Sequence, residues 1–256
     1  MATNAGTARA EVQLRIMVGI PDRAFGKADG TGVKTSHMFL YLPIKSSRTG
    51  RTWLNNNLGA DYADLNSHTF NLAQQARYKG DYHAFGSLFQ WGGKSDGHEL
   101  TAWYGNGYNA GKLKTAPTYF NWSRTSHNGH FVLTGGDWRG SDNGSLWNTS
   151  VTNPNNACPV GFRVPTASEW KAEMGIGSNN HTWNNSQYAY NTNLKLTVSG
   201  FRWGSTVTTK SNNWGYYWSA DSSYCRTAHA LSIYPREMKM HRWFRGFGFN
   251  VRCIKN

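Results

Sequence analysis

Residues 158–177, CPVGFRVPTASEWKAEMGIG, carry the clearest local signal in the sequence. Thr166 and Glu169 have the spacing of a capping box, in which each side chain bonds the backbone amide of the other residue at the start of a helix. Pro165 stands just before the cap, and Gly175 stands where a helix commonly ends in a left-handed residue. The stretch therefore predicts a short helix bounded on both sides.

This helix covers residues 167–174 and places Trp170 and Met174 on one face. Outside it, alternation and apolar runs predict short strands rather than further long helices. The predicted strands are 38–44, 194–201, 216–219, 229–234 and a closing strand 247–254.

The predicted strand 229–234 has a face pattern that bears on which residues reach solvent. Leu231 and Ile233 are expected to face the core, and His229 shares their parity. Ser232 and Tyr234 are then safer surface positions than His229.

The remaining chain divides at about residue 45. Residues 1–45 predict an N-terminal strand, attachment or oligomerisation element, and residues 46–256 predict the main domain. Residues 70–78 are polar and possibly helical, whereas 101–155 predict a long loop excursion, which in a compact domain is usually functional.

Composition limits the fold and the partners. Aromatic residues make up 14% of the chain and glycine occurs 28 times, so we expect an aromatic-rich core, short strands and long loops. The charge balance of 27 basic and 14 acidic residues favours anionic partners. Because no Lys/Arg run concentrates that charge, a nucleic-acid partner is not expected.

The sequence predicts neither a membrane span nor an export signal. No apolar run is long enough to cross a bilayer, so membrane insertion is not predicted. The first residues lack a basic start followed by an apolar stretch, so no signal peptide is predicted.

Metal and cofactor chemistry has weak support. His98 and Glu99 could suggest a zinc helix, but position 102 is alanine, where that motif needs its second histidine. A solvated turn after Gly92 and Gly93 is the preferred interpretation. Calcium needs clustered carboxylates, which 14 scattered acidic residues do not supply. We therefore predict no metal, no cofactor and no catalytic residue.

Several motifs together resemble a known family. The run CPVGFRVPTASEW resembles the signature Cys-Pro-x-Gly-aromatic-x-Val-Pro-Thr-x-x-Glu-Trp of the Fibrobacter succinogenes major paralogous domain. The segments RTWLNNNLGA, FGSLFQWG, YYWSA and RGFGFNVRC match the other landmarks of that family in order. The resemblance covers roughly residues 50–254.

The resemblance implies an α+β fold of the C-type lectin type, with short strands, few short helices and long loops. Within that group the chain is most similar to the variable proteins of diversity-generating retroelements, in which a reverse transcriptase rewrites codons of the C-terminal segment. Such a protein binds ligands and is not an enzyme. Its partner is a protein or glycan receptor on a target cell, its place is a phage tail or a bacterial surface, and it can form homo-oligomers.

The same resemblance divides the C-terminal segment into scaffold and variable positions. Tyr217, Trp218, Ser219 and the closing strand match invariant parts of the family. The loops 221–227 and 235–244 are where we expect contact with ligand. The implied ligand-binding residues are Tyr216, Asp221, Ser222, Ser223, Tyr224, Arg226, Thr227, His229, Ser232, Tyr234, Arg236, Glu237, Met238, His241, Trp243 and Phe244.

The three cysteines allow one disulfide and leave one thiol. The family resemblance implies that Cys158 and Cys253 form the pair. Two alternatives stay open: a formylglycine-generating-type enzyme, in which Cys225 and Cys253 would be copper-binding thiols, and a non-diversified adhesion module of a bacterial envelope.

Overall fold

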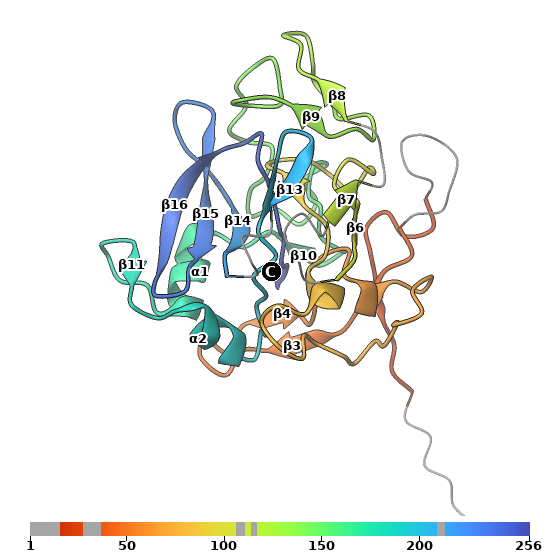
Figure 1. Ribbon diagram of the computed structural model, residues 1–256, viewed down its shortest axis with the longest axis vertical. Coiled ribbons are helices and arrows are strands. Elements are labelled where there is room, and N and C mark those ends of the chain that lie inside the picture. The colour runs from red at the N-terminus through yellow and green to blue at the C-terminus, as the bar shows by residue number, and fades with distance from the viewer. Residues whose placement is uncertain (1–15, 28–36, 106–110, 114–116, 209–212) are drawn as a thin grey trace, which may run out of the picture.

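The computed structural model describes residues 16–27, 37–105, 111–113, 117–208 and 213–256. Figure 1 shows several small sheets and few helices joined by long irregular segments. The predicted β-rich α+β class with short strands is confirmed. The helices are η1 (Asp61–Ala63), η2 (Tyr82–Ala84), α1 (Ala167–Met174) and α2 (Ser186–Asn191).

The sheet with the longest strands is antiparallel and is formed by the C-terminal part of the chain. Its order is β11-β16-β15-β14, and helix α1 packs against β14, β15 and β16. We call it the large sheet. Its strands are β11 (His181–Thr182), β14 (Gly215–Ser222), β15 (Thr227–Ile233) and β16 (Met238–Phe244).

Smaller sheets surround the large sheet. One four-stranded sheet contains β10 (Phe162–Arg163), β18 (Ile254–Lys255), β4 (Thr52–Leu54) and β3 (Pro43–Lys45). Another contains β13 (Thr206–Thr208), β12 (Phe201–Trp203), β17 (Gly248–Phe249) and β5 (Phe89–Gln90). The remaining pairs are β1 (Ile20–Pro21) with β2 (Leu40–Tyr41), β6 (Thr101–Trp103) with β7 (Gly111–Leu113), and β8 (Thr118–Tyr119) with β9 (Val132–Leu133).

Helix α1 has the predicted ends. The Thr166 hydroxyl accepts a hydrogen bond from the Glu169 amide at 3.1 Å, and the Thr166 amide donates to the Glu169 carboxylate at 2.8 Å. Gly175 ends the helix at φ 68°, in the left-handed region. Trp170 and Met174 are fully buried, so the predicted face is confirmed.

A disulfide joins Cys158, ahead of α1, to Cys253 near the C-terminal end of the chain. This is the pair that the family resemblance implies, and Cys225 is left as an exposed free thiol. The two cysteines named in the enzyme alternative are therefore not equivalent here, since Cys253 is in the disulfide and Cys225 is not.

The predicted scaffold residues are held by buried hydrogen bonds. The Trp218 indole donates to the Phe89 carbonyl at 2.7 Å, and the Tyr217 hydroxyl donates to the Thr197 carbonyl at 2.8 Å. Arg252 is 1% exposed and donates to Asn57 Oδ1 at 2.9 Å and to three backbone carbonyls. Burial lowers the pKa of the Arg252 guanidinium to about 10. These residues cannot vary without loss of packing or buried hydrogen bonds.

Two predicted strands are wrong in extent. Residues 194–199 lie outside any strand and all but Lys195 are buried, because the Thr197 amide bonds the Tyr217 hydroxyl and the Val198 amide bonds the Lys79 carbonyl instead of a neighbouring strand. The closing strand is broken into β17 and β18, and between them the Cys253 carbonyl accepts from the Leu54 amide of β4 and the Val251 carbonyl from the Leu58 amide after β4.

Two further expectations are corrected. Residues 70–78 form turns rather than a helix. Residues 238–244, predicted as part of a contact loop, form β16 in the large sheet. Met238 and Met240 pack into the core on the α1 side, which gives the segment the alternation of a strand.

The predicted boundary at residue 45 is not a structural boundary. β3 lies before it and β4 after it, yet the two strands pair in one sheet. Phe39 and Tyr41 lie in the same core cluster as Trp218. Residues 1–15 lie outside the described residues. Within the described ranges, no helix is long and apolar enough to cross a membrane.

Candidate functional site

The turn between β14 and β15 is the most strained part of the large sheet. The Thr227 amide donates to the Tyr224 carbonyl at 3.3 Å, so Cys225 and Arg226 are the central residues of a β-turn. Both have positive φ, 53° and 60°, which defines a type I′ turn. Such turns favour Asn and Gly, because a side chain with a Cβ is strained in the left-handed region. Cys-Arg is therefore a poor choice for folding alone.

The buried Arg245 hydrogen-bonds the backbone on both sides of this turn. Arg245 is 1% exposed, and its guanidinium donates to the carbonyls of Thr227 at 3.1 Å and Ser223 at 3.3 Å. The same group forms ion pairs with Asp137, at 3.2 Å, and with Asp142. The loop after β9 is thereby tied to the base of the hairpin.

Two pairs of arginine and aromatic side chains are in contact at this end of the hairpin. The Arg242 guanidinium lies 4.3 Å from the centroid of the Tyr224 ring, and the Arg226 guanidinium lies 5.1 Å from the Trp122 ring. Tyr224 is 66% exposed and Trp122 is 71% exposed. We call these four side chains the tip surface. Large aromatics at such exposure contribute little to the fold.

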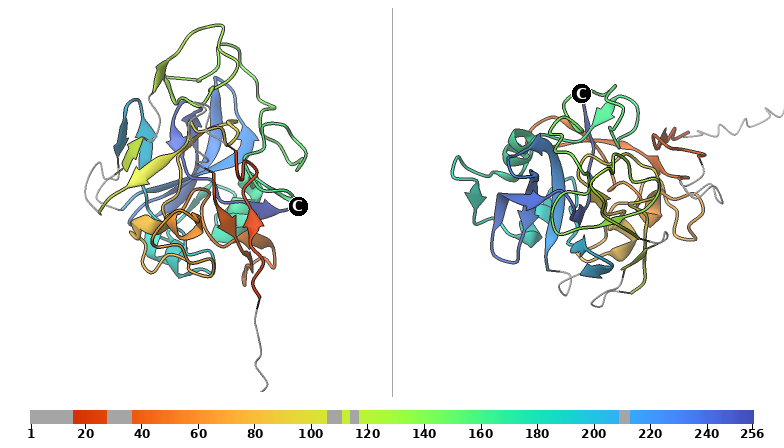
Figure 2. Two further views of the ribbon diagram at one scale, coloured as in Figure 1. Left: turned by 90° about the vertical axis from the view of Figure 1, so that its right-hand side faces the viewer. Right: turned by 90° about the horizontal axis from the view of Figure 1, so that it is seen from above.

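The segment carrying Trp122 reaches the tip from another part of the chain. Residues 118–133 rise beside the upper end of the large sheet (Figures 1 and 2). Gly140 lies against the backbone of Trp122, where an added Cβ would be 1.6 Å from the Trp122 carbonyl oxygen. Only glycine allows this close approach, and the Gly140 amide donates to the Arg124 carbonyl at 3.0 Å.

A pocket of about 380 Å³ opens beside the tip surface. We call it the tip pocket. The Trp203 and Phe247 rings stack at its wall, with centroids 5.6 Å apart and planes 25° apart. Its lining residues are Gly135, Trp203, Thr227, His241, Arg242, Trp243, Phe244 and Phe247.

The structure separates the predicted ligand-binding residues into two ends of the large sheet. The β14–β15 turn lies at the upper end in Figure 1, and the β15–β16 turn lies at the lower end. Because β15 has 7 residues, the two turns are about 20 Å apart. They do not form one surface. Ser222, Ser223, Tyr224, Arg226, Thr227, Trp243 and Phe244 lie at the upper end, whereas Tyr234, Arg236 and Glu237 lie at the lower end. His241 pairs with Ala230 at the middle of β15.

Three of the predicted surface residues are buried. Tyr216 is 1% exposed and stacks on Phe249 at 4.8 Å. Ser232 is 0% exposed and accepts a hydrogen bond from the Trp243 indole at 3.1 Å, and Met238 lies in the core beside α1. A macromolecular partner cannot reach these side chains, so their assignment to the binding surface is wrong.

The expected order of Ser232 and His229 is also reversed. His229 does share the face of Leu231, as its parity predicts, but it is half-buried while Ser232 is fully buried. Both faces of the large sheet are covered, one by α1 and the other by the aromatic core. Exposure therefore depends on position along the strand rather than on its face.

Asp221 has a structural task. Its carboxylate accepts a hydrogen bond of 2.6 Å from the Ala167 amide, in the first turn of α1. An acidic group there satisfies a free amide and suits the helix dipole. A β-bulge between Trp218 and Ser222 turns this part of β14 toward the helix.

The lower end of the sheet has its own recess of about 540 Å³, lined in part by Trp183 and Arg236. Glu237 is engaged there by His181 at 2.8 Å and by Lys239 at 2.6 Å. Tyr234 is half-buried against Trp214. These contacts involve Glu237 and Tyr234 in the protein's own packing.

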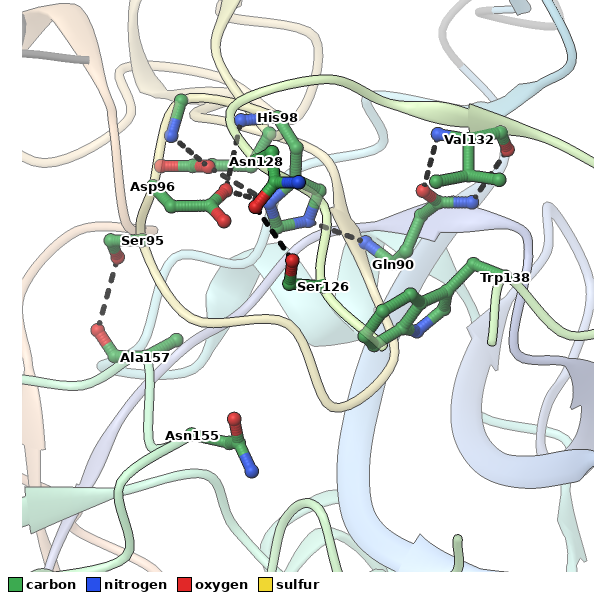
Figure 3. Close-up of polar contacts among 12 residues, drawn as sticks. Gln90, Ser95, Asp96, His98, Ser126, Asn128, Val132, Trp138, Asn155 and Ala157 are labelled. Carbon is green, nitrogen blue, oxygen red and sulfur yellow. Dashed lines mark hydrogen bonds and ion pairs between the residues drawn. The ribbon is translucent and has the colours of Figure 1, made fainter. Parts of the chain in front are cut away.

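The rings of two buried histidines, His98 and His127, stack on each other, and Figure 3 shows His98 with its partners Asp96 and Gln90. His98 is 0% exposed and Glu99 is 1% exposed, so the predicted solvated turn is wrong. The rings of His98 and His127 are nearly parallel, at 8°, with centroids 3.7 Å apart, and His127 also stacks on Trp138 at 3.7 Å. Asp96 bonds His98 Nδ1 at 2.8 Å, and the Gln90 amide donates to His98 Nε2 at 3.3 Å.

Within the described ranges, Asp96, His98 and His127 form the one group with potential metal-ligand atoms close together, within 4.8 Å of one another. A metal ion lies in the plane of each imidazole that binds it, along the nitrogen lone pair. Lone pairs of parallel stacked rings do not converge, and both nitrogens of His98 already have partners. The arrangement therefore acts as packing and does not form a coordination site.

Sequence reasoning missed Trp122 of the tip surface and Trp203 of the tip pocket. Both are single tryptophans in Gly-, Asn- and Ser-containing stretches without periodicity. High exposure marks both of them, together with the contact between Trp122 and Arg226 and the place of Trp203 in the lining of the tip pocket.

Comparison with known proteins adds no name to this site. No family model matches the chain, and no curated protein or solved structure matches it.

Proposed function

We propose that this protein is a ligand-binding protein whose tip surface contacts a protein or glycan receptor on a target cell. The observation that carries the proposal is the exposed, strained tip held by a buried framework. Tyr224, Arg226 and Trp122 have large exposed or half-exposed side chains, while Arg245 below them is fully buried. Rigid aromatic and arginine side chains supply contact area and hydrogen bonds, as in antibody paratopes.

We further propose that the fold is of the C-type lectin type and that the chain is the variable protein of a diversity-generating retroelement. The family motifs in the sequence and the division between buried scaffold and exposed tip support this proposal. Display on a phage tail or a bacterial surface fits the same class. A homo-oligomer would present several tips at once and gain avidity.

The genetic test is direct. The DNA beside the coding sequence is expected to carry a reverse transcriptase gene and an imperfect repeat of the 3′ coding segment that differs at adenines. Sequencing sibling copies should find substitutions at Tyr224 and Arg226, and none at Trp218 or Arg245. Lack of both the reverse transcriptase and the repeat would refute the retroelement assignment.

The binding test separates the two ends of the sheet. Fluorescently labelled protein is incubated with a panel of bacterial cells, and bound fluorescence is measured by flow cytometry. Tyr224→Ala and Trp122→Ala should each lower binding to a responsive strain by tenfold or more, about the effect of losing one aromatic anchor. Arg236→Ala, at the lower end, is the matched control and should bind as the parent protein does. Equal binding by all variants would contradict the tip as the recognition surface.

A further inference from the structure

A pocket of about 420 Å³ is lined by no residue of the large sheet, the tip surface or the tip pocket. We call it the basic pocket. It lies between the turn that follows β1, the segment that follows β5 and Pro154, which belongs to the segment ahead of β10. Its volume falls in the range of pockets that enclose small ligands.

Hydrogen bonds fix the walls of the basic pocket to one another. The Arg23 guanidinium donates from Nε to the Cys158 carbonyl at 2.6 Å and from Nη2 to the Val151 carbonyl at 2.8 Å. The Ser95 hydroxyl donates to the Ala157 carbonyl at 3.3 Å (Figure 3). Both outer walls are therefore held against the same segment ahead of β10. A concavity fixed in this way is preformed, so a ligand does not have to order it.

The charge in the basic pocket is mainly positive. Arg23, Lys27 and Lys94 line it, and Asp96 is the one acidic residue in the lining. Within the described ranges, none of the three basic side chains forms an ion pair with a carboxylate. A hollow lined mostly by one sign of charge concentrates ions of the opposite sign, so this pocket attracts anions.

The Asp96 carboxylate is engaged by the protein itself. Its Oδ1 lies 2.8 Å from His98 Nδ1 and accepts a hydrogen bond of 3.3 Å from the His98 amide. Lys27 and Lys94 are exposed, and their ammonium groups have no hydrogen-bond partner among the described residues. The donors that remain free in the pocket are therefore cationic.

From this arrangement we infer that the basic pocket binds a small phosphate monoester. A phosphate group carries about −1.5 to −2 charge near pH 7 and three acceptor oxygens, which suits donors from three basic side chains opposed by one carboxylate. A carboxylate has a single charge, which one arginine fork satisfies. Ala24 and Pro154 provide an apolar wall for the rest of the ester. The inference goes beyond the proposed function and does not depend on it.

Glucose 6-phosphate and glucose are suitable probes, because they differ only in the phosphate group. Isothermal titration of the full chain at fixed ionic strength should give a Kd at least about tenfold lower for glucose 6-phosphate. Lys27→Gln and Lys94→Gln should each weaken its binding about fivefold or more, the effect of losing one charge-assisted hydrogen bond. Lys94→Glu reverses the charge and should abolish binding.

The matched control is Lys45→Gln, which removes an exposed lysine of β3 and lowers the net charge by the same amount. It should bind glucose 6-phosphate as the parent does, and thermal melting checks that each variant is folded. Equal affinity for the two sugars would overturn the inference. An equal loss in Lys45→Gln and Lys94→Gln would also overturn it, because the net charge of +13 would then account for the binding.

A free phosphate ester and a phosphate group on a cell-surface polymer share this chemistry. Adding saturating glucose 6-phosphate to the cell-binding experiment separates the two sources. Unchanged cell binding assigns the pocket to a free ester, whereas reduced cell binding by the parent and not by Lys94→Glu assigns it to a surface polymer. If the titrations fail while Tyr224→Ala still loses cell binding, this inference is wrong and the proposed function stands.

Discussion

Beneath the hairpin tip, the guanidinium of Arg245 connects the turn, the Asp137–Asp142 loop and the Trp91 ring. Replacing it by leucine leaves Asp137, which is 2% exposed, without its cation. Removing one partner of a buried ion pair commonly costs about 3–5 kcal/mol. We expect Arg245→Leu to lower the free energy of unfolding by about 3 kcal/mol in urea titrations.

The matched control is Arg236→Leu, because Arg236 is exposed at the other end of the sheet. It should change stability by less than about 0.5 kcal/mol. Adding Asp137→Asn to Arg245→Leu should recover part of the loss. If Arg245→Leu costs less than 1 kcal/mol, the tip is held by other contacts.

At the same scale, the sequence indicates which side chains belong to the framework better than which belong to the surface. Motif matches place Tyr217, Trp218 and Cys253 in the framework, and all three are fully buried. The family resemblance places Tyr216 at the surface and strand parity places Ser232 there, but both side chains are buried. Burial on both faces of a sheet is set by what packs on it, and that depends on segments far away in the sequence.

The β14–β15 hairpin allows a prediction at the level of one element. Cys225 and Arg226 occupy left-handed positions that cost roughly 1 kcal/mol or more each for residues with a Cβ. Replacing them by Asn-Gly, the preferred type I′ pair, should raise the free energy of unfolding by about 1–2 kcal/mol. The same change should weaken cell binding, because Arg226 leaves the tip surface. A neutral or lower stability would show that the turn is not strained.

The buried His127, stacked on His98, makes the stability of the folded chain depend on pH. Burial is the main cause that holds the pKa of His127 well below its ordinary value, with His98, Arg124 and Arg139 adding to it and Asp96 opposing it. The unfolded chain takes up a proton near pH 6.5 and the folded chain does not. Stability due to this group is therefore full above pH 6.5 and falls as pH drops, by up to about 1.4 kcal/mol per pH unit.

The measurement compares the parent with His127→Phe, which keeps a ring between His98 and Trp138. Urea titrations between pH 7 and 5 should show a smaller loss of stability on acidification in the variant. Burial raises the pKa of Asp22 to about 6, which acts in the opposite direction, but this effect is common to both proteins and cancels in the difference. Equal slopes would mean that His127 takes up its proton over the same pH range in the folded and the unfolded chain.

Among elements, α1 was fully predictable because capping is a local interaction between residues three apart. β16 was not, since its alternation of Met238 and Met240 lies among Lys, His and Arg side chains that also suit a loop. Residues 194–200 show the opposite case. Their alternation predicts a strand, but the partners of the Thr197 and Val198 amides are a side chain and a distant carbonyl, which no local pattern encodes.

For the whole molecule, the Cys158–Cys253 disulfide connects the start of the α1 region to the end of the chain, 95 residues apart. Closing a loop of that length restricts the unfolded chain and stabilises the fold by roughly 4–5 kcal/mol in the chain-entropy model. Since β18 pairs with both β10 and β4, the C-terminal end also joins the two sides of one sheet. Loss of the bond should therefore affect the molecule as a unit and not the tip alone.

We expect Cys158→Ala with Cys253→Ala to lower the free energy of unfolding by about 3–5 kcal/mol, and reductant to lower the melting temperature of the parent but not of this variant. Cys225→Ser is the control, because it removes the exposed free thiol and keeps the disulfide. It should melt as the parent does under both conditions. If the tip is rigid on its own framework, the double variant below its melting temperature should still bind cells through Tyr224 and Trp122. Loss of binding in a folded double variant would show instead that the tip surface depends on the disulfide through the whole core.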